Sequence, residues 1–243
     1  MVAVAEGLYH SPWQDCYDPA RVLRRETFAS LELSGEPVVF VPNWNHLIVT
    51  GSGDTGGLAT ALAFSMKVLA EEPRPMSGLP LVKRSGEWMD FALPKGHPVE
   101  PLLRQARVLE MSSVYGDQGP LIEKQLEREG RDVFVAQYNG TQNEQEKTFS
   151  SYAVWSKGVP TLLPRTERVF FFDEDGPSDS KVVAQVEWET VLLHCGALLG
   201  EAGYTPPRFL VESFPSPRQL EAMIATEGAR RDTGEPEERA TAD

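Results

Sequence analysis

The sequence of 243 residues is poor in cysteine, with only Cys16 and Cys195. Small secreted domains that depend on disulfides carry many more cysteines for their length, so this class of protein is not favoured. Both cysteines have aromatic or apolar neighbours, which predicts that they pack as small buried side chains. Residues 1–10 also lack a basic start followed by an apolar run. We therefore expect no signal peptide and a cytoplasmic location.

Long apolar runs and an excess of basic residues are absent as well. No stretch reaches the roughly 20 apolar residues that a membrane-spanning helix needs. Lys and Arg total 23 against 36 Asp and Glu, which gives a formal net charge of -13 and a pI near 4.8. A nucleic acid or an anionic membrane requires clustered Lys and Arg, so neither is expected as a partner. A basic peptide or protein is compatible with this charge.

The residues that carry metal or nucleophilic chemistry show no useful spacing. The histidines are His10, His46, His97 and His194, and no H-x-x-x-H or C-x-x-C motif occurs. His194 and Cys195 are neighbours on a predicted helix and point in different directions, so they do not form a nucleophile and its base. A G-x-S-x-G motif is also missing. We therefore predict no metal, no cofactor and no catalytic residue.

The apolar content, 41% of the chain, is enough for an ordinary globular core. In the first half the apolar spacing changes between helical and strand-like periods. It predicts a helix at 19–33, a hairpin of 38–41 and 47–50, a glycine-rich turn at 51–57, a helix ending at 71–72, and a hairpin of 79–83 and 88–93. We predict an α+β fold with mixed or antiparallel sheets and helices packed on one face.

The second half continues this mixture of elements. Its helices are expected at 101–129 with a break at 116–120, at 187–199, and in a short segment from Pro217. Its strands are expected at 132–139, 148–156, 169–172, 181–186 and 208–213. The order of elements suggests two related sheet-plus-helix halves. The alternative is that such a rhythm is common to any α+β protein.

Prolines and glycines at 94–101 predict a linker between the two halves. We therefore expect an N-terminal half at 1–95 and a C-terminal half at 96–226. Beyond Thr226 the chain is charged and has no large apolar residue, which predicts a disordered tail at 227–243.

The glycine-rich turn is the strongest candidate for a cofactor site, because it matches G-x-G-x-x-G between a strand and a helix. The residues that would contact a nucleotide or phosphate are Gly51, Gly53, Asp54 and Gly56. However, the acid that holds a ribose should end the second strand, whereas Glu71 and Glu72 end the helix. A hairpin also precedes the turn, where a βαβ unit is expected. The alternative is an ordinary turn in which Asp54 or Thr55 caps the helix.

The same turn contains the triplet Asp54-Thr55-Gly56, which is typical of aspartic proteases. Those enzymes need two carboxylates that share a proton. The sequence has no second triplet, and glycines rather than apolar residues precede the aspartate. An acidic cluster at Glu127, Glu129 and Asp132 is interpreted as a solvated surface, with a groove for a cationic ligand as the alternative.

Aromatic residues are the best candidates for contacts with a partner, because Trp and Tyr dominate binding hot spots. Trp44 and Asn45 lie in the predicted turn of the first hairpin, where a Trp often packs against its own domain instead. Tyr152 and Trp155 lie in the predicted strand 148–156. An open strand can accept a peptide by main-chain pairing, which needs no special motif.

Short motifs in the first half resemble one bacterial family. They are Asp18-Pro-Ala-Arg-Val-Leu, Val38-Val-Phe-Val-Pro42, His46-Leu-Ile-Val49, Asp54-Thr-Gly56, Pro80-Leu-Val82 and Gly86-Glu-Trp88. The family is catalogued as domain of unknown function 1444, and the resemblance spans residues 17–95. It implies a turn of Asp-Thr-Gly between a strand and a helix. Gly51 and Gly53 lie outside the family pattern, and the family brings no established activity.

These patterns favour a non-catalytic accessory protein that binds a peptide or a protein segment and forms a homodimer. Presenting a peptide to modifying enzymes is one such role. Two alternatives stay open: an enzyme that holds a nucleotide or phosphate in the turn at 51–56, and a structural protein that assembles with itself.

Overall fold

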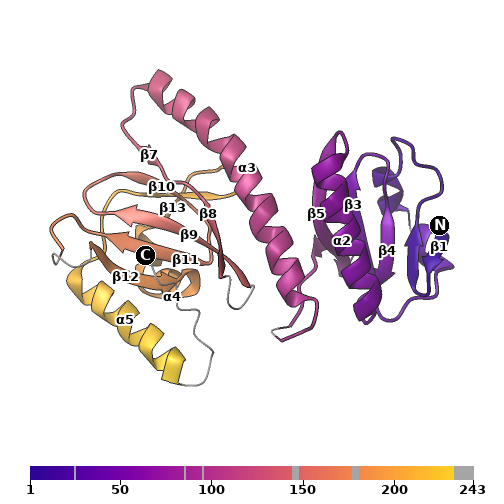
Figure 1. Ribbon diagram of the computed structural model, residues 1–243. Coiled ribbons are helices and arrows are strands. Elements are labelled where there is room, and N and C mark those ends of the chain that lie inside the picture. Colours follow the sequence, from indigo (N-terminus) through magenta and orange to yellow (C-terminus); the bar gives the residue numbers. More distant parts are fainter. Residues whose placement is uncertain (25, 85, 95, 144–147, 177–180, 233–243) are drawn as a thin grey trace. The chain divides into compact units, whose positions relative to one another are not determined.

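The computed structural model describes residues 1–243 except 25, 85, 95, 144–147, 177–180 and 233–243. The chain forms two compact units, residues 1–110 (unit 1) and 111–243 (unit 2). Helix α3 (Glu100–Glu129) begins in unit 1 and continues into unit 2 (Figure 1). The division therefore falls inside a helix, whereas the sequence suggested the stretch at 94–101. Helices pack on antiparallel or mixed sheets, which confirms the predicted α+β class.

Unit 1 is built on an antiparallel sheet of six strands in the order β1-β2-β4-β3-β5-β6. The strands are β1 (Val2–Ala5), β2 (Leu8–His10), β3 (Pro37–Asn43), β4 (Ile48–Gly51), β5 (Pro75–Arg84) and β6 (Glu87–Asp90). The helices before α3 are the 3-10 helix η1 (Pro19–Leu23), α1 (Glu26–Ala29) and α2 (Thr55–Glu71). The two predicted hairpins are confirmed as β3–β4 and β5–β6.

Both faces of the unit 1 sheet are covered. Alternate residues of β3 point to opposite sides of the sheet and pack into different clusters. Val38 and Phe40 pack on one face against Leu62 of α2. Val39 packs on the other face in a cluster that includes Phe28 of α1. The segment predicted as one helix at 19–33 is therefore two short helices, η1 and α1, which cover this second face. Arg24 between them has an extended backbone.

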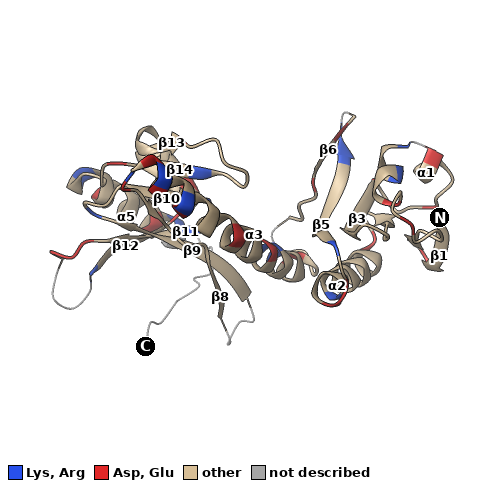
Figure 2. Ribbon diagram, turned by 90° about the horizontal axis from the view of Figure 1, so that it is seen from above, with Lys and Arg blue, Asp and Glu red and all other residues tan. Residues whose placement is uncertain are grey.

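Unit 2 contains two sheets of four strands, in the orders β13-β14-β10-β7 and β12-β11-β9-β8. The strands are β7 (Phe134–Val135), β8 (Asn139–Asn143), β9 (Thr148–Ser156), β10 (Thr161–Pro164), β11 (Arg168–Phe172), β12 (Val182–Glu187), β13 (Gly200–Glu201) and β14 (Arg208–Val211). The helices are α4 (Trp188–Cys195), the 3-10 helix η2 (Gly196–Leu198) and α5 (Pro217–Asp232). Strands β8 and β9 carry no charged side chain (Figure 2).

Parallel pairing distinguishes unit 2 from unit 1. β7 is parallel to β10 and β9 is parallel to β11, whereas every pairing in the unit 1 sheet is antiparallel. The two units also differ in the order of their strands. The related halves that the sequence suggested are therefore not reproduced in strand order or direction.

The core of unit 2 lies between the β9–β11 sheet and the last two helices. Trp155 and Phe171 are at most 1% exposed, with ring centroids 5.2 Å apart. Val191 of α4 and Met223 of α5 complete this cluster. Burying side chains of this size stabilises a fold by roughly 1.5–3 kcal/mol each, so this cluster fixes both helices on the sheet.

Two helix predictions are corrected by the structure. Helix α3 runs without a break through 116–120, with Pro120 inside it. Proline weakens a helix there, but Tyr115 and Gln118 donate to carbonyls of the segment before β14 and hold this part of α3 in place. Helix α5 extends to Asp232, so the predicted tail is wrong for 227–232, and 233–243 lie outside the described residues. In the described ranges, no helix is long and apolar enough to cross a membrane.

Candidate functional site

Strand β7 is the terminal strand of its sheet and is paired on one edge, with β10. Phe134 N–H donates to Pro160 O at 2.8 Å, and Ala136 N–H donates to Leu162 O at 3.1 Å. Because the backbone groups of alternate residues point to opposite edges of a strand, those of Val135 face away from β10. Within the described part of this sheet, no strand lies beyond β7. The edge is nevertheless mostly covered at Val135, which is 5% exposed, and it is more open at Phe134, which is 54% exposed.

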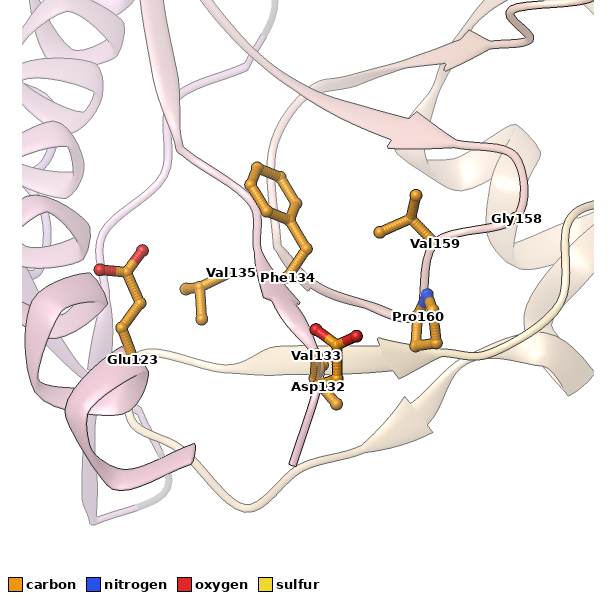
Figure 3. Close-up of a pocket in the computed structure, with 8 residues that line it drawn as sticks. All are labelled: Glu123, Asp132, Val133, Phe134, Val135, Gly158, Val159 and Pro160. Carbon is orange, nitrogen blue, oxygen red and sulfur yellow. The ribbon is translucent and has the colours of Figure 1, made fainter. Parts of the chain in front are cut away.

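A pocket of about 420 Å³ opens beside β7 (Figure 3). Phe134 of β7 and Val159 of the turn before β10 project toward the same open space, and they are 54% and 43% exposed. Glu123 of α3 and Asp132 contribute carboxylates. The full lining is Glu123, Asp132, Val133, Phe134, Val135, Gly158, Val159 and Pro160.

The predicted contact strand 148–156 is β9, which lies between β11 and β8. Both of its edges are paired, so it cannot accept a further strand. Trp155 is 1% exposed and belongs to the core, which makes it a structural residue. Tyr152 is half-buried and stacks on Phe170 with ring centroids 4.6 Å apart. β9 is therefore not an edge strand, whereas β7 is one of the strands that end the described sheets of unit 2.

The predicted contact residues of unit 1, Trp44 and Asn45, lie in the turn between β3 and β4. The guanidinium of Arg74 stands 4.4 Å from the centre of the Trp44 ring. The side-chain oxygen of Asn45 is buried without a hydrogen-bond partner among the described residues. Its backbone N–H donates to the side chain of Asn43 at 3.2 Å. This turn is packed against its own unit, as the alternative interpretation of Trp44 supposed.

Two histidines far apart in the sequence meet beside this turn. His10 Nε2 and His46 Nδ1 are 2.8 Å apart, and His46 Nε2 lies 3.1 Å from a carboxylate oxygen of Glu72. Phe64 of α2 stands edge-on to both imidazole rings. Burial and then the proximity of His46 lower the pKa of His10. No local spacing in the sequence predicts this cluster, because the pairing of β2 with β4 brings its members together.

The glycines of the turn at 51–57 serve close packing of the backbone. A side chain at Gly51 would collide with the backbone of Ser34. Gly53 N–H donates to Ser34 O at 2.8 Å, so this amide is not available to a phosphate. Gly56 is exposed, with only the Asp54 carboxylate near the position of a side chain.

The start of α2 is already occupied by a carboxylate. Asp54 caps the helix, accepting from Gly57 N–H at 2.9 Å and from the Thr50 hydroxyl at 3.1 Å. A phosphate bound at this helix start would meet that negative charge instead of free amide groups. The geometry supports the capped turn over the nucleotide site.

Cys195 and His194 make separate contacts, as their positions on the helix predicted. The Cys195 thiol is buried against Met223, and burial raises its pKa to about 11, so it is not a nucleophilic thiolate at neutral pH. His194 Nε2 lies 2.9 Å from the Thr226 hydroxyl. Over the described ranges of the chain, no three His, Cys, Asp or Glu side chains are grouped so as to hold a metal ion.

Arg208 of β14 is the most deeply buried cation of unit 2, at 2% exposed. Its Nη1 donates to the carbonyls of Ala136 at 2.7 Å and Leu162 at 3.2 Å, and its Nε donates to Gln118 at 2.7 Å. The guanidinium also stands 5.1 Å from the centre of the Tyr115 ring. Arg208 therefore joins β14, β10 and α3 beneath the open edge of the sheet, and its role is structural.

Comparison of the chain with known proteins gave no family model, no curated protein and no solved structure that matches it. The resemblance of residues 17–95 to the uncharacterised bacterial family therefore stays a hypothesis. The function has to be argued from the geometry of the described residues.

Proposed function

We propose that unit 2 is a peptide-binding module that takes an extended segment as an additional strand on the outer edge of β7. The observation that carries the proposal is an edge strand with no strand beyond it in the described sheet, beside a pocket where exposed Phe134 and Val159 lie among carboxylates. Such a module suits a non-catalytic accessory protein that holds a peptide for other proteins to act on. No reactive group takes part in this kind of binding.

Main-chain pairing would supply the affinity. The N–H and C=O groups of Val135 point to the side without a strand. They would bond to the peptide backbone once the local packing that leaves Val135 5% exposed opens. β7 pairs with β10 in parallel, and in the described part of the sheet no strand next to β7 in the sequence forms a hairpin with it. Leu162 and Ile122 pack against Val135 from within unit 2, which holds the edge in position for a partner.

Side chains of the peptide would supply the selectivity, because alternate residues of an added strand point to the same side. A side chain directed into the pocket would meet Phe134 and Val159, which favours an apolar residue there. The carboxylates of Glu123 and Asp132 favour a basic residue close by. We therefore propose an extended peptide with apolar and basic residues as the ligand.

The test begins with selection of binders from a phage-displayed library of random peptides against the full chain. A selected peptide carrying a fluorophore is then titrated with the protein and followed by anisotropy. Phe134→Glu places a charge in the pocket, and we expect about tenfold weaker binding, which corresponds to about 1.4 kcal/mol. Leu193→Glu is the matched control, because Leu193 of α4 is 69% exposed and does not line the pocket.

Amide chemical shifts show where the peptide binds. We expect the largest changes at 133–135 and slower hydrogen exchange of the Val135 amide. Equal affinity of the two variants, or shift changes confined to unit 1, would contradict the proposal. A dimer that Phe134→Glu dissociates, in a protein that selects no peptide, would instead assign the edge to a second copy of this chain.

A further inference from the structure

Three side chains from distant parts of unit 1 form a hydrogen-bonded chain. His10 ends β2, His46 precedes β4, and Glu72 follows the last turn of α2. The contacts are His10 Nε2 to His46 Nδ1 at 2.8 Å and His46 Nε2 to Glu72 at 3.1 Å. His46 is 7% exposed. This chain closes the turn at 43–46 against β2 on one side and against the end of α2 on the other.

The hydrogen bonds determine where the protons lie. An ionised carboxylate can only accept, so the proton of neutral His46 sits on Nε2, facing Glu72. His46 Nδ1 is then an acceptor, and the proton between the two rings belongs to His10 Nε2. His10 Nδ1 is left with a free lone pair. In the closed arrangement, therefore, only one of the two facing nitrogens carries a proton.

We propose that His10 and His46 form a proton-binding site (the latch) that holds the turn at 43–46 in place. The contact between the two rings persists when the pair takes up one proton and breaks when it takes up a second. The first added proton goes to His10 Nδ1 and leaves the contact between the rings intact. The second would place N–H groups on both facing nitrogens, which lie 2.8 Å apart, and would bring two positive rings together. Two donors cannot share a hydrogen bond, so the contact breaks.

The surroundings decide how many protons the closed site tolerates. The charged groups near His10 are Glu72 at the end of α2, Asp18 before η1, and His46 itself. Glu72 also accepts from the side chain of Asn43. Asp18 is paired with Arg21 at 2.5 Å, which offsets its charge. Burial holds the pKa of His10 below its usual value, so the latch is closed at neutral pH.

Opening would release the turn that carries Trp44 and Asn45. The Ser11 N–H donates to Leu47 O at 2.9 Å, directly beside the histidine pair, and ties β2 to this segment. It therefore reports whether the latch is closed. The buried Asn45 oxygen without a hydrogen-bond partner would gain water on opening, which favours the release.

The experiment follows both imidazoles by ¹⁵N NMR as the full chain is titrated with acid, together with hydrogen exchange of the Ser11 amide. We expect acid to add a first proton at His10 and to break the contact between the rings only with a second proton. Exchange at Ser11, corrected for its intrinsic pH dependence, should stay constant through the first step and rise about tenfold or more at the second. Independent titration of the two rings, or exchange at Ser11 that ignores the second step, would overturn the proposal.

Variants separate the latch from a general loss of stability. His10→Gln removes one of the two facing imidazoles, so Ser11 exchange should no longer respond to acid. Glu72→Gln keeps a side chain of the same size and removes the charge that offsets the added protons, so opening should move to higher pH. An unchanged or lower opening pH in Glu72→Gln would contradict the proposal. His194→Gln in unit 2 is the control and should leave the response of Ser11 unchanged.

Discussion

Unit 1 and unit 2 differ in where their strands find partners. In the unit 1 sheet every pairing is antiparallel, and β1–β2, β3–β4 and β5–β6 join strands that follow one another in the sequence. In unit 2, β10 pairs with β14, four strands later, and with β7 in parallel. Both units contain three pairings between consecutive strands in the described residues. Unit 2 differs in its two parallel pairings and in the long sequence separation between β10 and β14.

One buried polar group from each unit shows how these groups are bonded. In unit 1 buried polar side chains bond to one another, as in the contact of His46 with Glu72. In unit 2 Arg208 bonds to backbone carbonyls, and the outer edge of β7 has no strand beyond it in the described part of the sheet.

The largest expected effect is that of Arg208→Ala on unit 2. The Ala136 carbonyl would lose the Arg208 donor, and the Leu162 carbonyl would keep its bond from the Ala136 N–H. We expect a loss of about 3–5 kcal/mol in the free energy of unfolding. Urea unfolding followed by hydrogen exchange in each unit measures it. Arg165→Ala, at a mostly exposed side chain, is the control and should change stability by less than about 0.5 kcal/mol. Equal losses in both units would show that the comparison of separate units is wrong.

Leu62→Ala should show the reverse pattern, with unit 1 destabilised by about 3 kcal/mol. Leu62 is 1% exposed and packs between α2 and the sheet, so its removal leaves a cavity. The same exchange experiment measures the effect, with Lys67→Ala on the exposed side of α2 as the control. A loss of protection in unit 2 as large as that in unit 1 would contradict the prediction.

A smaller effect is expected for Asp54→Ala, which removes the cap of α2 and should cost about 1 kcal/mol. Asp54→Asn should restore most of it, because Asn caps a helix as well as Asp does. Thermal unfolding measures both variants. Dinucleotides should not raise the Tm of the wild-type protein. A rise that Gly53→Val abolishes would show that the turn binds a nucleotide after all.

The smallest effect is the dependence of unit 1 stability on pH through His10. Because burial lowers its pKa in the folded state, the unfolded chain binds more protons near pH 6.5. The stability that this histidine contributes is therefore complete above pH 6.5 and is lost as the pH falls through the lower folded-state pKa. Chemical unfolding between pH 7.5 and pH 5.5 should show a shallower slope for His10→Gln. An unchanged slope would assign the effect to another group.

Features encoded in short segments were predicted from the sequence. Both hairpins of unit 1 and the Asp54 cap follow from local patterns, because their contacts lie within a few residues. The choice of β9 as the open edge was wrong, because an apolar alternating strand looks the same at the centre and at the edge of a sheet. The break at 116–120 was also wrong, because contacts of Tyr115 and Gln118 with distant carbonyls outweigh the local cost of glycine and proline.

The sequence by itself determined the α+β class, the strands and helices with strong periodicity, and the start of α2. Only the tertiary structure decided that β7 is an open edge, that Phe134 and Val159 line one pocket, and that His10 meets His46. The reason is physical. Hydrogen bonds within a helix or a hairpin join residues that are close in the chain, so local sequence encodes them. The pairing of β7 with β10 and of β2 with β4 depends on the packing of whole layers, which no single segment specifies.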